Sequence, residues 1–190
     1  MKLREYRALT DEELVQRITR NGENKLFGIL YERYNKKVQE KCYSLLKNRE
    51  LANSLAVEIL SRVYEKLSGF KGNSSFSSWL YSVTYNHCID YLRVNKKLHY
   101  PEWNNQQELP EIVDVTDEDL TDIHYARLLK LLDILHTEEK AMIMMKYKDD
   151  MPIKEIAASM RLTESAVKMR LMRARARLIF LYKTNYGNYS

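Results

Sequence analysis

The sequence predicts an all-α fold, on the evidence of its turn formers and its composition. Gly and Pro together make up about 4% of the 190 residues, against roughly 12% in an average protein. Sandwiches and barrels need many more turn formers, so they are excluded. Apolar residues account for 45% and charged residues for 30% of the chain, which is typical of a globular protein that buries a core.

The distribution of charge predicts two small domains joined by an acidic linker. Residues 98–120 contain seven acidic residues and no Lys or Arg, whereas the regions on both sides are basic. The same stretch holds two of the three prolines and a run of Asn and Gln with no helical period. The expected division is a domain at 1–97, a linker at 98–120 and a domain at 121–190. The linker is either a solvated spacer or an acidic segment that occupies a groove meant for nucleic acid.

The first domain is expected to be a four-helix bundle. Thr10 and Glu13 form a capping box, which opens a short helix that ends near Gly22. Apolar residues then recur at helical spacing along three longer segments, and a turn-rich stretch at 68–75 precedes the last of them. The expected helices span residues 11–21, 24–47, 49–67 and 76–96.

The second domain is expected to end in a helix-turn-helix. A helix at about 122–135 precedes one opened by Thr137, and two further helices follow at 153–160 and 163–182. Only Arg161 and Leu162 separate these last two helices, which is typical of the motif. A helix-turn-helix turn often contains Gly, and a non-Gly residue such as Arg161 costs roughly 1 kcal/mol there if its backbone is left-handed.

The final helix has a basic outward face. With Thr163 as N-cap, an advance of about 100° per residue places Val167, Leu171, Ala174 and Leu178 on one apolar side. Ser165, Met169 and Met172 lie on the opposite side, flanked by Lys168 and Arg173. The helix contains no acidic residue between Ser165 and Tyr182. A helix that enters the major groove of DNA needs such a face.

Several classes of function are not expected. The chain carries no phosphate-binding Gly loop, nucleophile elbow or metal-binding His pair, so we expect no enzyme activity, no cofactor and no metal. Its two cysteines, Cys42 and Cys88, do not have the spacing of a zinc site or a disulfide framework. We find no secretory signal and no apolar run long enough to cross a bilayer, so the expected compartment is the cytoplasm and no direct membrane insertion is expected.

Two motifs in the chain belong together. The first is the loop and helix at 70–81, continued by Asn86 and residues 90–93. The second is Glu155-Ile156-Ala157 followed by residues 164–175. With both motifs in this order, the chain resembles the extracytoplasmic-function (ECF) sigma factors of bacterial transcription initiation, from about Phe27 to Leu181. The resemblance implies a sigma region 2 domain, a region 4 domain, core RNA polymerase and promoter DNA as partners, and an anti-sigma factor linked to the membrane.

The resemblance also implies site residues. The region 4 helix would read the −35 element as duplex DNA through Ser165, Lys168, Met169, Met172, Arg173 and Arg175. The region 2 loop and helix would capture the melted −10 element through Lys71, Asn73, Ser74, Ser75, Phe76, Asn86, Arg93, Lys96 and Lys97. Polymerase would dock on Ser54, Val57 and Glu58, where the family usually has an acid and a Gln at the first two positions. The linker would thread close to the path of nascent RNA.

Two other readings of the residues remain open. The first is a conventional DNA-binding regulator, with a helical effector domain followed by the helix-turn-helix, although such a regulator has no reason to carry the motif at 70–97. The second is a helical interaction module whose basic faces bind an acidic partner.

Overall fold

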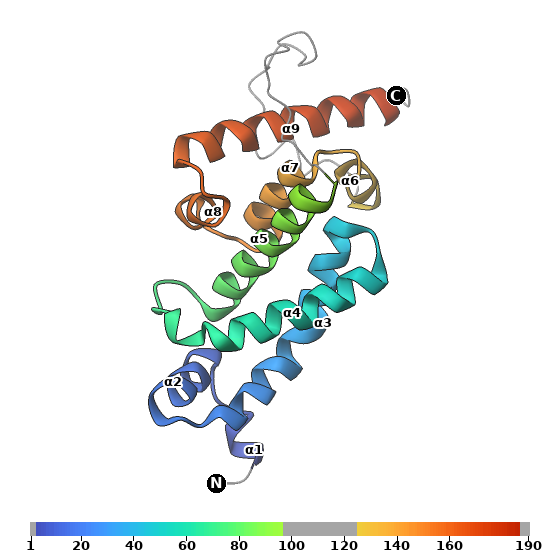
Figure 1. Ribbon diagram of the computed structural model, residues 1–190. Helices are drawn as coiled ribbons and strands as arrows, with labels where there is room; N and C mark the ends of the chain where they lie inside the picture. The colour runs from blue at the N-terminus through green and yellow to red at the C-terminus, as the bar shows by residue number, and fades with distance from the viewer. Residues whose placement is uncertain (1–2, 97–124, 187–190) are drawn as a thin grey trace. The chain divides into compact units, whose positions relative to one another are not determined.

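The computed structural model describes residues 3–96 and 125–186, and all regular structure in these two ranges is helical (Figure 1). This confirms the predicted fold class. The chain divides into two compact units, here called unit 1 (Met1–Lys96) and unit 2 (Lys97–Ser190). The acidic linker predicted at 98–120, and Lys97 with it, lies outside the described residues.

Unit 1 is built on three long helices that contact one another, α3, α4 and α5, and α2 packs against both α3 and α5. Its core is aliphatic and aromatic, with Leu14, Leu30, Leu80 and Tyr85 almost completely buried. The helical segments are α1 (Leu3–Tyr6), α2 (Asp11–Asn21), η1 (Asn24–Leu26), α3 (Phe27–Leu46), α4 (Arg49–Glu65), η2 (Leu67–Gly69) and α5 (Phe76–Lys96).

Helix α2 begins with the capping box and ends at the glycine that the sequence predicted. The hydroxyl of Thr10 accepts a hydrogen bond from the backbone N–H of Glu13 at 3.2 Å, and the Thr10 N–H donates to the Glu13 carboxylate at 2.7 Å. The Thr10 N–H, together with the Thr10 hydroxyl that donates to the same carboxylate at 3.0 Å, holds the pKa of the Glu13 carboxyl below its usual range. Gly22 ends the helix with a left-handed φ of 68°, a conformation that glycine adopts without steric cost.

Unit 2 is organised around its last helix, which contacts α6, α7 and α8. The final helix begins at Glu164, as the predicted N-cap Thr163 requires, and the Thr163 hydroxyl accepts from the Ala166 N–H at 3.1 Å. A π-helical turn that the sequence did not predict extends α7. The segments are α6 (Tyr125–Leu132), α7 (Thr137–Ile143), η4 (Met144–Lys148), α8 (Ile153–Met160) and α9 (Glu164–Tyr186).

Arg161 takes the strained conformation expected for the turn between α8 and α9, with φ 56° and ψ 44°. We expect Arg161→Gly to raise the free energy of unfolding of unit 2 by up to about 1 kcal/mol, because glycine relieves the left-handed strain and loses part of that gain to its more flexible unfolded state. Thermal denaturation of the full chain measures the change. Arg161→Ala is the control, since alanine keeps the strain; if it stabilised the chain as much as glycine, the strain would not be the cause.

Candidate nucleic-acid interface

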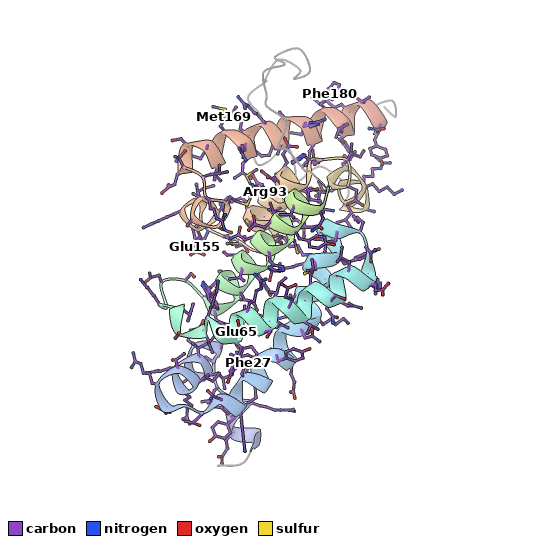
Figure 2. All side chains as sticks on the ribbon, in the orientation of Figure 1. Phe27, Glu65, Arg93, Glu155, Met169 and Phe180 are labelled. Carbon is purple, nitrogen blue, oxygen red and sulfur yellow. The ribbon has the colours of Figure 1, made fainter. Side chains whose placement is uncertain are left out.

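The outward face of α9 is arranged as the helical period predicts. Val167, Leu171, Ala174 and Leu178 are all buried against the rest of unit 2. On the other side, Ser165 and Lys168 are exposed in the N-terminal half of the helix. Met169 projects there as well, with 46% of its surface exposed (Figure 2). The side that remains open is therefore the side predicted to face DNA.

The other residues predicted for this contact are less open. Met172, Arg173 and Arg175 are half-buried, and the Arg175 guanidinium donates to the Tyr147 hydroxyl at 3.3 Å, on the π-helical turn. The structure thus brings Ser165, Lys168 and Met169 together as one exposed group and places Arg175 against the protein. Arg170 also belongs to the folded interior, since it forms an ion pair with Glu138 of α7 at 3.2 Å.

The loop before α5 is open in unit 1. Lys71, Asn73 and Ser75 are exposed, Ser74 is half-buried, and Gly72 has a left-handed φ of 71° that suits glycine. The Ser75 hydroxyl caps α5 by accepting from the Ser78 N–H at 3.1 Å. The exposed loop can therefore offer backbone and side-chain polar groups to a ligand.

Phe76, which the sequence predicted among the contacts to the −10 element, does not present its ring to a ligand. Only 1% of its surface is exposed, and its ring packs edge-on against Tyr34 of α3 at 5.5 Å between centroids. Phe70, at the other end of the loop, is half-buried and packs on Phe76 and Trp79 at 5.8 and 5.5 Å. Phe70 was not among the predicted contact residues. Its place between Gly69 and Lys71, in the turn-rich stretch, could have indicated an aromatic side chain at the edge of the loop.

The remaining predicted DNA contacts lie along α5. Asn86 is half-buried, and Arg93 is exposed on the C-terminal half of the helix (Figure 2). Asp90, one turn before, forms an ion pair with Arg93 at 3.4 Å and so shares its charge. Lys96 is the last residue of α5, and Lys97 is outside the residues that the structure describes.

The residues predicted to dock on polymerase share the solvent face of α4. Ser54 and Glu58 are exposed, and Val57 has 54% of its surface exposed. Glu58 forms an ion pair with Arg62 at 2.7 Å and lies 3.6 Å from His87 Nε2 on α5. Burial lowers the pKa of His87, an effect that the Glu58 carboxylate partly opposes.

No group of three or more metal-ligating side chains occurs within residues 3–96 and 125–186. Over the same two ranges, no helix combines the length and the apolar character that a membrane span requires.

Comparison with known proteins assigns both units to a family. Residues 30–98 match the family model of sigma-70 region 2, and residues 125–178 match that of sigma-70 region 4. The ECF RNA polymerase sigma factor SigW of Bacillus subtilis is 28% identical over 173 residues, which is 84% of this chain and 90% of SigW. The ECF RNA polymerase sigma-E factor of Escherichia coli K12 is 25% identical over 176 residues, or 88% of this chain and 91% of sigma-E.

Solved structures share the fold. CnrH, solved in complex with the cytosolic domain of CnrY, matches with a TM-score of 0.62 and 21% identity over 92% of this chain and 98% of CnrH. The sigma factor RpoE of Bartonella quintana, solved with the anti-sigma factor NepR, matches with a TM-score of 0.58 and 18% identity over 84% of this chain and 98% of RpoE. With region 2 in unit 1, region 4 in unit 2 and relatives that match along most of their length, the chain belongs to the ECF sigma factors of the sigma-70 family.

Proposed function

We propose that this protein is an alternative sigma factor that binds core RNA polymerase and directs promoter-specific transcription initiation in the cytoplasm, with no catalytic activity of its own. Unit 2 contacts the −35 duplex and unit 1 holds the melted −10 strand. The observation that supports this proposal is that each unit leaves exposed one surface predicted to bind nucleic acid: the loop at 71–75 in unit 1, and the side of α9 that carries Lys168 and Met169 in unit 2.

In unit 2, the first two turns of α9 enter the major groove. Thr163 caps the helix with a neutral hydroxyl, so the positive end of the helix dipole can approach a phosphate. Lys168 contacts the DNA backbone, Ser165 and Met169 meet base edges, and Met172 and Arg173 extend the contact along the groove. Arg175 contributes through its charge, because its side chain is held by Tyr147.

In unit 1, the loop and α5 bind a strand whose bases are unpaired. Removing a base from the stack costs a few kcal/mol, and a fitted pocket recovers that energy. Lys71, Asn73, Ser74 and Ser75 offer the polar groups of the pocket and Phe70 its aromatic surface, in place of the buried Phe76. Asn86 reads a base edge, while Arg93, Lys96 and Lys97 neutralise phosphates.

Protein partners bind elsewhere on the molecule. The exposed face of α4 with Ser54, Val57 and Glu58 docks on polymerase, and the exposed valine makes that contact more apolar than an acid and a Gln would. An anti-sigma factor is a further partner, by analogy with RpoE, which was solved with the anti-sigma factor NepR. That factor is linked to the membrane, by analogy with CnrH, which was solved with the cytosolic domain of CnrY.

Run-off transcription with sigma-free core polymerase tests the function. Purified protein is expected to produce discrete transcripts from a genomic fragment library, and the start sites identify its promoters. If the protein bound duplex DNA but produced no promoter-dependent transcript, the chain would act as a conventional regulator. If it bound neither DNA nor polymerase, a helical interaction module would be the better account.

Asn86→Ala is expected to slow promoter opening about tenfold while leaving duplex binding unchanged, because a lost hydrogen bond of roughly 1 to 1.5 kcal/mol acts only on the melted state. Opening is measured by permanganate reactivity of the −10 thymines, and duplex binding by anisotropy. Asn95→Ala is the matched control, since Asn95 is exposed on the same helix and donates to the Tyr91 carbonyl at 3.0 Å. Equal losses in both assays would contradict the assignment of Asn86.

A further inference from the structure

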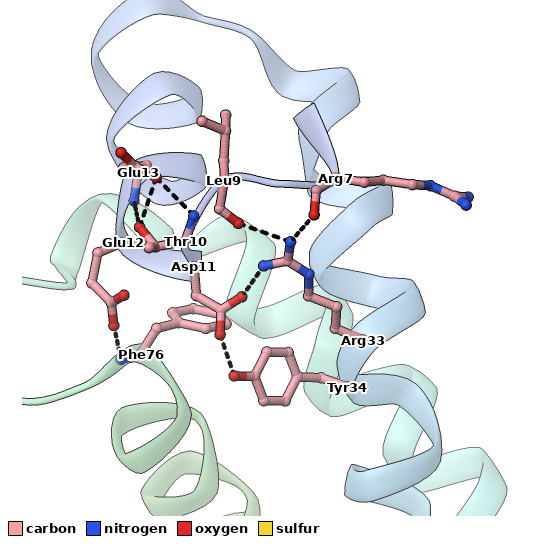
Figure 3. A network of polar contacts seen from close by, with 9 residues as sticks. All are labelled: Arg7, Leu9, Thr10, Asp11, Glu12, Glu13, Arg33, Tyr34 and Phe76. Carbon is pink, nitrogen blue, oxygen red and sulfur yellow. Dashed lines mark hydrogen bonds and ion pairs between the residues drawn. The ribbon is translucent and has the colours of Figure 1, made fainter. Parts of the chain in front are cut away.

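The N-terminus of α5 is capped by a residue from a distant part of the chain. The backbone N–H of Phe76 donates to Glu12 Oε1 of α2 at 2.9 Å, across 64 residues of sequence (Figure 3). The first N–H groups of a helix have no partner within the helix, and a carboxylate there is also favoured by the helix dipole. Glu12 therefore fixes the point at which the exposed loop at 71–75 joins α5.

Glu12 is itself held in a rigid setting. The capping box of Thr10 and Glu13 sets the first turn of α2 on either side of it. Its neighbour Asp11 forms an ion pair with Arg33 and accepts a hydrogen bond from the Tyr34 hydroxyl, and both partners belong to α3 (Figure 3). The Arg33 guanidinium also donates to the Leu9 carbonyl at 2.8 Å. The turn that presents Glu12 is thus bound to α3 independently of the loop.

Phe76 is held both by Glu12 of α2 and by Tyr34 of α3. Tyr34, which bonds to Asp11, also packs edge-on against the buried Phe76 ring. The side chain of Phe76 is consequently fixed by α3, and its backbone N–H is fixed by Glu12 of α2. The residues just before it, Asn73 and Ser75, are exposed. One end of the loop is therefore clamped, while Asn73 and Ser75 remain on the surface where a ligand can reach them.

We propose that Glu12 is a positioning residue for the −10 element: it orders the loop at 71–75 through the Phe76 N–H, without touching DNA. This inference rests on the proposed function of the loop. A loop ordered in advance loses less conformational entropy when it binds a base. The same carboxylate occupies the positive end of α5, so a DNA phosphate is kept away from it and the loop meets the base instead.

The test compares two variants of Glu12 with two control variants in the holoenzyme. The probes are a fluorescent single-stranded non-template oligonucleotide that carries the −10 element of a promoter found by run-off transcription, and the −35 duplex of the same promoter. We expect Glu12→Ala to weaken binding of the −10 oligonucleotide about tenfold and binding of the −35 duplex less than twofold. Glu12→Gln should lose no more than about threefold, because its amide oxygen can accept the same N–H. Glu40→Ala, an exposed carboxylate on α3, is the matched control and should change neither affinity.

Thr10→Ala separates positioning from simple loosening of α2, since it breaks the capping box and leaves the bond from Phe76 to Glu12 intact. It should lower the melting temperature but leave −10 binding within twofold at a temperature where the chain is folded. Three results would overturn the inference and leave the proposed function standing. They are equal losses of −10 affinity in Thr10→Ala and Glu12→Ala, no loss of −10 affinity in Glu12→Ala, and a loss in Glu12→Gln as large as that in Glu12→Ala. If the wild-type holoenzyme failed to bind the oligonucleotide, the proposed function of the loop would fall, and the inference with it.

Discussion

Reversing the charge of Lys168 is expected to weaken binding of the holoenzyme to the −35 duplex by roughly ten- to a hundredfold. Lys168 is exposed near the N-terminal end of α9, in the half of the helix proposed to enter the major groove. Lys168→Glu would remove one phosphate contact and add a repulsion, together about 1.4 to 2.8 kcal/mol. The plot of log affinity against log salt concentration should also become less steep by at least about 0.9, the slope carried by one phosphate contact.

Lys183→Glu is the control for Lys168→Glu, because it makes the same change of charge on the same helix. Fifteen residues separate the two lysines, which is about 22 Å along α9, and Lys183 is likewise exposed. Its reversal should weaken duplex binding less than twofold when both variants are titrated at several salt concentrations. Equal losses of duplex affinity in the two variants would mean that only the overall electrostatic field of the protein matters. If Lys168→Glu bound the duplex as tightly as the wild type, this half of α9 would not be the DNA face.

The side of α9 that faces the core could be predicted from the sequence, because it depends only on the helical period. Four apolar residues spaced three or four apart must lie on one side, and the structure buries all four, from Val167 to Leu178. The capping box at Thr10 and the cap at Thr163 were predictable for a similar reason, since each bond joins residues three apart. Local geometry is sufficient for both kinds of inference.

The partners of particular side chains could not be predicted, because they come from remote parts of the chain. Two phenylalanines flank the loop of unit 1, and Phe76 is the buried one, packed against Tyr34 from the remote helix α3. The bond from the Phe76 N–H to Glu12 spans 64 residues and has no local signature. The π-helical turn at Met144–Lys148 also has no marker in the sequence.

Among the cations of α9, the helical period alone does not separate those that serve DNA from those that serve the fold. Arg170 is the clearest case, because nothing in the sequence distinguishes it from the other basic residues of this helix. In the structure its guanidinium lies 3.2 Å from the carboxylate of Glu138, a side chain on α7 with 1% of its surface exposed. Arg170 is therefore a structural residue, whereas Lys168, two residues away, is exposed and is proposed to contact DNA.

Arg170→Met is accordingly expected to lower the free energy of unfolding of unit 2 by about 3 kcal/mol, because it leaves the Glu138 carboxylate buried without its guanidinium partner. For a unit of this size the melting temperature should fall by more than about 10 °C. Thermal denaturation of the full chain gives the size of the effect, and hydrogen exchange measured on peptides from α7 and α9 assigns it to unit 2.

Lys168→Met is the matched control, with the same loss of charge at an exposed position, and it should unfold like the wild type while losing duplex affinity. The double variant Glu138→Met/Arg170→Met removes both charges, so it should recover most of the stability that Arg170→Met loses. If the double variant were no more stable than Arg170→Met, the packing of the arginine stem rather than its charge would hold α9 against α7. If Arg170→Met were fully stable but defective in duplex binding, Arg170 would belong to the DNA face after all. The stability of unit 2 and its affinity for the −35 element should therefore respond to different cations of the same helix.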